Sequence, residues 1–596
     1  MKIIPSSPGR ILATTALALV LSAGLQACGG DSSDGTSVSV SPPPPPPPPP
    51  PTPTPPPPTQ SSVTISGTAT FQDVPVTSGN GLDYDSIVNT PIRGATIELL
   101  DANDFALETS QTGLNGEYSF TVDSNTPVRV RVRAELVQTT GTTWSVRVQD
   151  NTSSACVEEL NGPGDNDNTF NCPIYVLDGS LTSSGTANST RNLNADAGWG
   201  TIGYVRDRVA APFAILDPIF DTLQEFEATA PGTNFPQADF NWSAANVSAQ
   251  GDNSDGDIGS SSYTGNGQIF ILGEANQDID EYDQHVVVHE WGHYFEDLLS
   301  RSDSIGGGHS LSDRLDARLA FGEGFGNAIA AIGNDDPIYR DSGGNQQSLG
   351  FNFNIEGATN AINDGWFSET SVQEILYDIF DSDNDAGDTV SLGLGAIIDA
   401  LTSTEYKEIT VFTTIFSFMD IMRDQNPGSA AGFDALMAEQ SINGTGPTGT
   451  GETNNGGVPS VLPVYQTVTI NGGPIVVCSL DAVDNFGSDD FNLLGTRDFI
   501  NFTRTNPAPV TITATLIPSM SDSTDVDPDF FVFSQGTPVA AGVSDPAASE
   551  TITSTLQGVT GDFVIDFYDF DNIDETAGAD RPRQGGDSCY NFTITQ

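Results

Sequence analysis

From about residue 62 the chain alternates apolar and polar positions in short runs that turn residues separate. The runs SVTISGTATF, PVRVRVRAEL and TWSVRVQD place Val, Ile, Trp and other apolar residues at every second position. Because successive side chains of a strand point to opposite faces, this pattern predicts antiparallel strands with one buried face. The same alternation returns near residue 461, in VTITATLI and DFVIDFYDF. The sequence therefore predicts two β-sandwiches, one on each side of a different middle region.

In the middle region, which starts near residue 198, apolar residues recur at helical spacing. Helical periodicity is clear in YVRDRVAAPFAILDPIFDTLQEFEA, LAFGEGFGNAIAAIG and TSVQEILYDIFD, whereas GQIFILG has the pattern of a buried strand. The region ends near residue 442, where NGTGPTGTGETNNGG has the composition of a linker. We expect a mainly helical α+β domain here.

The N-terminus has the pattern of an export signal. Two basic residues precede an apolar run of about 15 residues, which is short for a membrane span of about 20. LQAC, ending at Cys28, resembles a bacterial lipobox, and this resemblance implies a lipidated Cys28 and, with Gly29 next to it, the outer membrane of a Gram-negative source. An ordinary signal peptide with a chance cysteine is the alternative. The proline tract 42–58 that follows predicts a stiff, extended spacer.

Charge and cysteine content narrow the range of possible partners and disulfides. The 79 acidic and 20 basic residues give a formal net charge of -59, which disfavours nucleic acid as a partner. With Cys28 lipidated, four of the five cysteines remain, and three disulfide connectivities are open. The local pairing is the most economical, and export is consistent with disulfides. It joins Cys156 to Cys172 and Cys478 to Cys589.

The strongest chemical signal is DQHVVVHEWGHYFEDLL at residues 283–299, which contains an H-E-x-x-H motif at His289, Glu290 and His293. Residues four apart lie on one face of a helix, so both imidazoles can bind one metal ion. Glu290 would then act as general base toward a water whose pKa zinc lowers to about 7. The motif predicts a zinc site, and calcium is a second candidate cation for this acidic chain.

A third ligand is available at Glu323, in the run GEGFGN between Gly322 and Gly324. The combination resembles the gluzincin metalloproteases, and GEGFGN is similar to the G-E-G-[WF] element of their fungalysin-like group. This resemblance implies that His289, His293 and Glu323 hold zinc. The metzincin pattern fails because Leu299 stands where its third histidine would be.

Two positions depart from the gluzincin pattern. Asn327 stands where an acid often orients a histidine ligand, although an amide oxygen can still accept a hydrogen bond from an imidazole. The later histidine that often stabilises the oxyanion is absent, which leaves four candidates for that role: His309, Tyr339, Tyr377 and Tyr406.

The two remaining histidines of the mature chain each have two interpretations. His285 lies one turn before His289, so it is expected either to approach the metal site or to lie behind the ligands or at the surface. His309 lies in a glycine-rich loop, where it is expected either to contact substrate or to be exposed.

Weaker resemblances concern the two sandwiches. GATIELLDAN with TGLNGEYSFTV resembles carboxypeptidase-regulatory-like or Cna-B-like modules, and DPDFFVFSQGTPV with GVTGDFVIDFYDF resembles the pre-peptidase C-terminal jelly roll of secreted proteases. The predicted domain map has five parts: 1–28 signal peptide and lipidated cysteine, 29–61 proline-rich linker, 62–190 β-sandwich, 191–450 zincin-like metallopeptidase domain, and 451–596 linker and second β-sandwich.

Three acidic runs, at residues 252–257, 381–388 and 566–575, are candidate calcium loops or solvated surface, and none fits an EF-hand.

Two functions remain open. One is a lipid-anchored zinc endopeptidase that acts on proteins or peptides outside the inner membrane. The other is a catalytically inactive binding or adhesion lipoprotein with a structural metal site.

Overall fold

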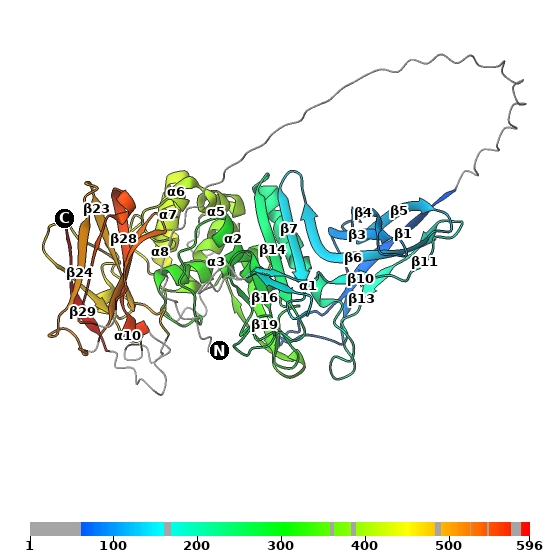
Figure 1. Cartoon of the computed structure of the whole chain (residues 1–596), viewed down its shortest axis with the longest axis horizontal. Helices are drawn as coiled ribbons and strands as arrows, with labels where there is room; N and C mark the ends of the chain where they lie inside the picture. The colour runs from blue at the N-terminus through cyan, green and yellow to red at the C-terminus, as the bar shows by residue number, and fades with distance from the viewer. Residues whose placement is uncertain are drawn as a thin grey trace, which may run out of the picture.

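The protein has several domains, with many β-sheets and a group of helices between them (Figure 1). Cys28 and the proline tract lie outside the residues that this computed structural model describes. The described residues are 61–159, 169–357, 363–382, 389–482, 485, 490–524, 526–544, 547–573 and 586–596. Within these ranges, no helix combines the length and apolar character that crossing a membrane requires.

The N-terminal part forms two sheets, as the alternating runs predicted. In β6 (Pro127–Gln138) buried positions alternate with more exposed ones along the strand, because one face packs on the core. The first sheet is built on one long strand, β1 (Ser62–Asp73). Its partners are β2 (Val88–Pro91), β5 (Glu117–Asp123), β12 (Ser189–Thr190) and β13 (Leu193–Ala195).

The second sheet has nine strands and extends into the middle of the chain. Seven of them lie in the order β15-β16-β14-β7-β6-β3-β4, and two more pair with β6. The eight strands besides β6 are β3 (Ala95–Leu100), β4 (Ala106–Gln111), β7 (Thr143–Gln149), β10 (Val176–Asp178), β11 (Thr182–Ser183), β14 (Asn234–Trp242), β15 (Ser262–Tyr263) and β16 (Gln268–Ile271).

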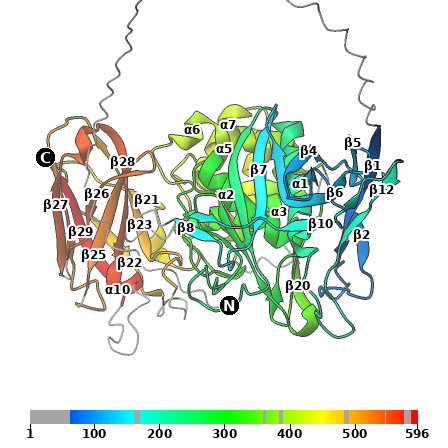
Figure 2. The ribbon, with the colours of Figure 1, turned by 45° about the vertical axis from the view of Figure 1, so that its right-hand side comes forward.

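This sheet changes the expected domain organisation. Strand β14 pairs parallel with β7, after helix α1 (Ala211–Thr229) has crossed over and packed on β6 and β7. A parallel partner requires such a crossover, which a local pattern of alternation does not reveal. The predicted boundary between residues 190 and 191 therefore separates strands of one sheet, and the first sandwich is not a separate unit (Figure 2).

The helical layer is centred on α2 (Gln284–Leu299) and α3 (Ala317–Asn334), which pack against each other. A small residue permits this contact: a Cβ on Gly292 would lie 2.6 Å from Cγ2 of Ile329 on α3. Gly324 likewise permits the contact of α3 with α4, because a Cβ there would lie 2.5 Å from Cβ of Val372. The other helices are α4 (Glu369–Phe380), α5 (Gly393–Thr402), α6 (Thr404–Lys407), α7 (Ile415–Gln425) and α8 (Ala430–Glu439).

A small antiparallel sheet lies beside these helices. It has the order β17-β18-β19-β20. Its strands are β17 (Gly273–Glu274), β18 (Asp278–Ile279), β19 (Ile338–Gly343) and β20 (Leu349–Asn354). Strand β18 precedes the start of α2, and β19 follows the end of α3. The sheet therefore connects the start of α2 with the end of α3.

The C-terminal part is β-rich and forms two packed sheets, which agrees with the predicted second sandwich. One sheet has the order β21-β23-β28-β25-β26, and the other has the order β22-β29-β24-β27. The strands are β21 (Tyr465–Thr467), β22 (Ile475–Ser479), β23 (Arg497–Arg504), β24 (Val510–Leu516), β25 (Pro528–Ser534), β26 (Thr537–Gly542), β27 (Ser549–Ser554), β28 (Gly561–Asp569) and β29 (Ser588–Thr595).

Both disulfides of the economical pairing are present. Cys478 and Cys589 join β22 to β29 in the C-terminal part. The disulfide between Cys156 and Cys172 links two short paired strands, β8 (Val157–Glu159) and β9 (Thr169–Asn171). Cys156 directly precedes β8, and Cys172 directly follows β9.

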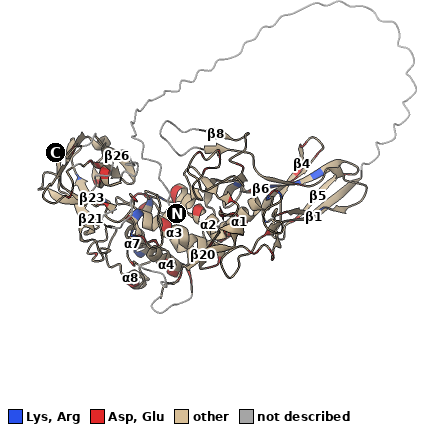
Figure 3. Cartoon of the chain, turned by 90° about the horizontal axis from the view of Figure 1, so that it is seen from below, with Lys and Arg blue, Asp and Glu red and all other residues tan. Residues whose placement is uncertain are grey.

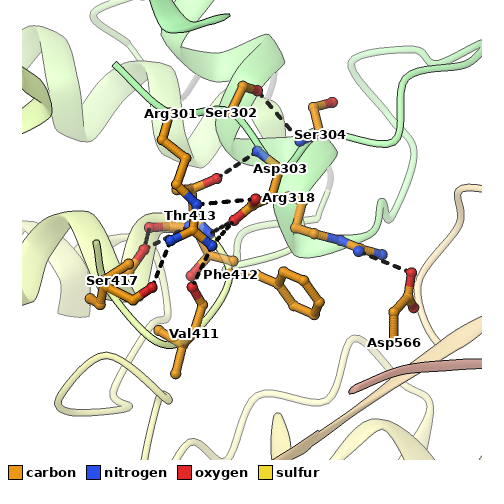
Figure 4. Close-up of polar contacts among 12 residues, drawn as sticks. Arg301, Ser302, Asp303, Ser304, Arg318, Val411, Phe412, Thr413, Ser417 and Asp566 are labelled. Atoms are coloured by element: carbon orange, nitrogen blue, oxygen red, sulfur yellow. Dashed lines mark hydrogen bonds and ion pairs between the residues drawn. The ribbon is translucent and has the colours of Figure 1, made fainter. Parts of the chain in front are cut away.

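The C-terminal part is fixed to the start of α3 by a buried ionic network (Figure 4). Arg318 bonds to Asp316 at the start of its own helix and to Asp566 on β28 at 3.1 Å, and Arg497 bonds to the same Asp566 at 2.9 Å. The guanidinium of Arg318 also lies 4.6 Å from the ring centroid of Phe412. Acidic residues occur in all parts of the molecule, so these paired carboxylates are a minority of the negative charge (Figure 3).

Candidate metal centre

Helix α2 places its two motif histidines side by side, with His289 buried and His293 partly exposed. His289 and His293 are one turn apart, and their Nε2 atoms lie 3.0 Å from each other. The rings are nearly perpendicular, with centroids 4.7 Å apart. Both Nε2 atoms therefore reach the same small volume.

Glu323 reaches this volume from α3. Its Oε2 lies 3.2 Å from Nε2 of His289 and 3.4 Å from Nε2 of His293. One ligand atom from each of the three residues falls within 4.8 Å of the other two. Two imidazole nitrogens and one carboxylate oxygen are a donor set that suits zinc, so the residues present fit the metal that the motif predicted.

The close approach of α3 to His289 depends on a glycine. A Cβ on Gly326 would lie 2.8 Å from Cε1, 2.9 Å from Nδ1 and 3.0 Å from Nε2 of the His289 ring. The imidazole therefore packs directly against the backbone of α3. Gly322 and Gly324 flank Glu323 in the sequence, whereas Gly326 is the residue that meets the ring.

A polar chain behind His289 fixes its orientation. Nδ1 of His289 lies 3.0 Å from Oδ1 of Asn327, and Nδ2 of Asn327 donates to Oε1 of Gln373 on α4. Because the Asn327 amide nitrogen is used by Gln373, its oxygen faces the imidazole and places the proton on Nδ1. Nε2 of His289 is then left with the lone pair that a metal ligand requires.

His293 has an acidic partner that the sequence analysis missed. Oε2 of Glu296 lies 3.8 Å from Nδ1 of His293, and Glu296 is buried. Burial alone would lower the pKa of His293, but the nearby carboxylates of Glu323, Glu296 and Glu290 raise that pKa well above its usual value. The spacing of three residues on one helix was a usable signal for this contact.

Glu290 lies beside the edge of the nine-stranded sheet. Its Oε2 accepts a hydrogen bond of 2.8 Å from the backbone N–H of Tyr263 on β15, the outermost strand. Only 8% of Glu290 is exposed. The carboxylate is thus held between the helix that carries the histidines and a sheet edge.

His309 is the other histidine at the centre, although it comes from the loop between α2 and α3. Its Nε2 lies 3.2 Å from Oε2 of Glu323 and 3.6 Å from Oε2 of Glu369, the first residue of α4. Burial opposes its charged form, yet these two carboxylates raise the pKa of His309 to about 9. Glu369 gave no signal in the sequence, because it joins the site only through the packing of α4 on α3.

The remaining candidates lie farther out. Nε2 of His285 lies 3.0 Å from the backbone oxygen of Asp336, and burial lowers the pKa of His285. The ring of Tyr339 lies 6.2 Å from the ring of His289, whereas Tyr377 packs against Phe380 on its own helix.

Tyr406 is buried on α6 beside Phe321, with ring centroids 6.5 Å apart. Among the four candidates for the oxyanion, His309 and Tyr339 are therefore the two that lie close to the ligand residues.

Three solved structures show weak similarity to parts of the chain. The pre-peptidase C-terminal domain of a Bacillus anthracis collagenase is 10% identical, with 22% of this chain and 93% of that chain covered and a TM-score of 0.15. Aeromonas hydrophila PliG, a periplasmic lysozyme inhibitor, is 14% identical, with 22% and 95% covered and a TM-score of 0.13. A 9R-lipoxygenase from Cyanothece is 11% identical, with 28% and 24% covered and a TM-score of 0.13. Scores this low support no inference about fold or function.

The sequence itself gives a more specific match. No curated protein matches the chain. Residues 234–416 match the family model of the Mycolysin C-terminal domain, and proteins of the Mycolysin type are typically secreted. The matched segment includes α2, α3 and α4, which supply the residues around His289. This part of the chain is therefore metalloprotease-related.

Proposed function

We propose that the chain is a zinc-dependent metalloendopeptidase in which His289, His293 and Glu323 hold the metal. The observation that carries the proposal is the convergence of their ligand atoms at separations of 3.0 to 3.4 Å, next to Glu290 of the same motif. When bound, zinc supplies a Lewis acid that lowers the pKa of water to about 7 and polarises a peptide carbonyl.

Glu290 is the proposed general base. The backbone N–H of Tyr263 holds one of its carboxylate oxygens, which fixes the direction of the group without using a second side chain. In this position Glu290 accepts a proton from the attacking water and returns it to the amide nitrogen that leaves. Asn327 holds the ring of His289 through its hydrogen bond, and the Glu296 carboxylate faces Nδ1 of His293 at 3.8 Å.

The proposed donor to the developing oxyanion is His309. Its Nε2 lies 3.2 Å from the carboxylate of Glu323, whereas the ring centroid of Tyr339 lies 6.2 Å from that of His289. A donor at this place would bond to the carbonyl oxygen as its negative charge develops.

The same contact supports the alternative of an inactive protein. Nε2 of His309 lies 3.2 Å from Oε2 of Glu323, so the two residues can form an ion pair. This pair would compete with the metal for Glu323, the third ligand. In that case the chain would serve as a binding or adhesion protein. We propose protein or peptide substrates for the active form, and export with a lipid anchor at Cys28 for both.

The test is a comparison of three purified proteins: wild type, Glu290→Gln, and Glu405→Gln as a control on an exposed position of α6. Zinc content is measured together with cleavage of casein and of a peptide library. We expect zinc in all three, and a loss of cleavage of at least about 100-fold only in Glu290→Gln. Zinc in the wild type without cleavage would favour the inactive protein, and cleavage that survives Glu290→Gln would refute the proposal.

A further inference from the structure

A second group of potential metal ligands lies outside the histidine centre. Asp278 on β18, Asp280 in the connection to α2, and Asp341 on β19 bring their carboxylate oxygens within 4.8 Å of one another. Asp283, the residue that precedes α2, is a fourth carboxylate close to them. The group stands where the small sheet meets the start of the helix that carries His289.

These carboxylates are buried without enough partners. Asp280 is 3% exposed and Asp283 is 2% exposed. The Oδ1 atoms of Asp278, Asp280 and Asp283 are all buried, and none has a hydrogen-bond partner among the described residues. The second oxygen of Asp283 accepts hydrogen bonds from the backbone and hydroxyl of Ser342. Three buried acceptors are thus left without a donor, a situation that is costly unless a proton or a cation is present.

Two arginines near the group pair with other carboxylates, next to Asp280 and close to Asp341. Arg208 pairs with Glu281, and Arg340 pairs with Asp336. Burial raises the pKa of Asp278 to about 6, although a contact with Asp280 opposes this shift. Burial, followed by the charge of Asp278, raises the pKa of Asp341 to about 7. Shared protons could relieve the repulsion, but one proton serves only one pair of oxygens, and the remaining buried acceptors would stay unsatisfied.

We propose that Asp278, Asp280 and Asp341 bind a calcium ion, with Asp283 at its side. The donor set consists of hard carboxylate oxygens from two segments about sixty residues apart, and calcium accepts six to eight such oxygens, with water completing the shell. The bound ion ties β18, β19 and the start of α2 together. This site is independent of the proposed zinc chemistry. No described residue of the three acidic runs belongs to it, and residues 383–388 and 574–575 of those runs lie outside the described residues.

The experiment measures the melting temperature of the full chain at constant zinc, with calcium chloride or with sodium chloride of equal ionic strength. The variant is Asp280→Asn with Asp341→Asn. The matched control is Asp123→Asn with Asp399→Asn, which removes the same charge from two exposed positions outside the acidic runs. The control is needed because a chain of net charge -59 gains stability from any cation that screens it.

We expect calcium to raise the melting temperature of the wild type and of the control by roughly 5 °C, and to leave the variant unchanged. An equal rise in the variant, an equal rise with magnesium, or no rise in the wild type would overturn the proposal.

A second measurement covers the case of a variant that does not fold. Terbium luminescence, excited through the adjacent Tyr282 in the wild type, is expected to appear and to be displaced by calcium. A signal that calcium does not displace contradicts the site. The calcium titration is repeated on Glu290→Gln, which lacks the proposed general base but keeps all four aspartates. A calcium response in this variant would show the calcium site even if the peptidase proposal fails.

Discussion

Gly326→Ala tests the metal centre through its geometry. The new methyl group would lie 2.8 Å from Cε1 of His289, whereas ordinary contacts begin at 3.4 Å, so the ring must move by about 0.6 Å. Metal–ligand distances in proteins hold to within about 0.2 Å, and a reacting group displaced by about 1 Å costs about 100-fold in rate. The substitution should therefore weaken zinc binding at least tenfold and lower kcat/KM by about 10- to 100-fold.

Stability should respond differently from activity. Alanine is about 1 kcal/mol better than glycine inside a helix, and this gain offsets much of the strain at the ring. We therefore expect a melting temperature within a few degrees of the wild type. The assay combines competition for zinc with a chelating dye and peptide hydrolysis under saturating metal.

The control for this variant is Gly395→Ala on α5, where the nearest atom to the added methyl group is the backbone oxygen of Thr229 at 3.6 Å. It should gain stability and keep full activity. A Gly326→Ala protein with unchanged zinc affinity and unchanged kcat/KM would refute the argument that His289 packs against α3 as a ligand.

Three further predictions concern neighbouring groups. Glu296→Gln should weaken zinc binding about tenfold without unfolding the protein, because His293 loses the carboxylate behind Nδ1. Arg318→Met should cost about 3 kcal/mol in denaturant unfolding, because it breaks the buried bond to Asp566. Burial raises the pKa of Asp498 to about 7, so its folded form holds a proton and stability falls as pH rises from about 4 to 7. Asp498→Asn should remove this fall and stabilise the protein by up to about 4 kcal/mol at pH 8, with little effect at pH 4.

Each of these predictions has a result that contradicts it. Wild-type zinc affinity in Glu296→Gln would mean that the 3.8 Å contact has no role in holding the ligand. An unchanged unfolding midpoint in Arg318→Met would mean that the C-terminal part is not fixed through this network. A stability difference for Asp498→Asn that is the same at pH 4 and pH 8 would show that the buried carboxyl does not retain its proton.

Local patterns in the sequence were sufficient for most elements. The alternation in PVRVRVRAEL corresponds to β6, and the helical period around His289 and Glu323 corresponds to α2 and α3. These predictions succeed because burial of one face imposes a fixed period on a strand or a helix. The spacing of four residues alone also predicts that His289 lies beside His293, as their Nε2 atoms do at 3.0 Å.

The sequence failed where distant segments meet. The parallel pairing of β14 with β7 depends on a crossover through α1, and no local period marks it. Glu369 and the cluster around Asp280 are likewise assembled from segments far apart in the chain. Glu296 is different, because its position one turn after His293 is a local signal that the sequence does contain.

The most direct test of the central claim is zinc reconstitution of the wild-type protein. Bound metal is removed with a chelator, calcium is then kept in excess, and peptide cleavage is followed while zinc is added back. We predict no cleavage without zinc and a linear return of activity that ends at about one zinc ion per chain. Cleavage that persists in the metal-depleted protein, or zinc binding that restores none, would contradict the account.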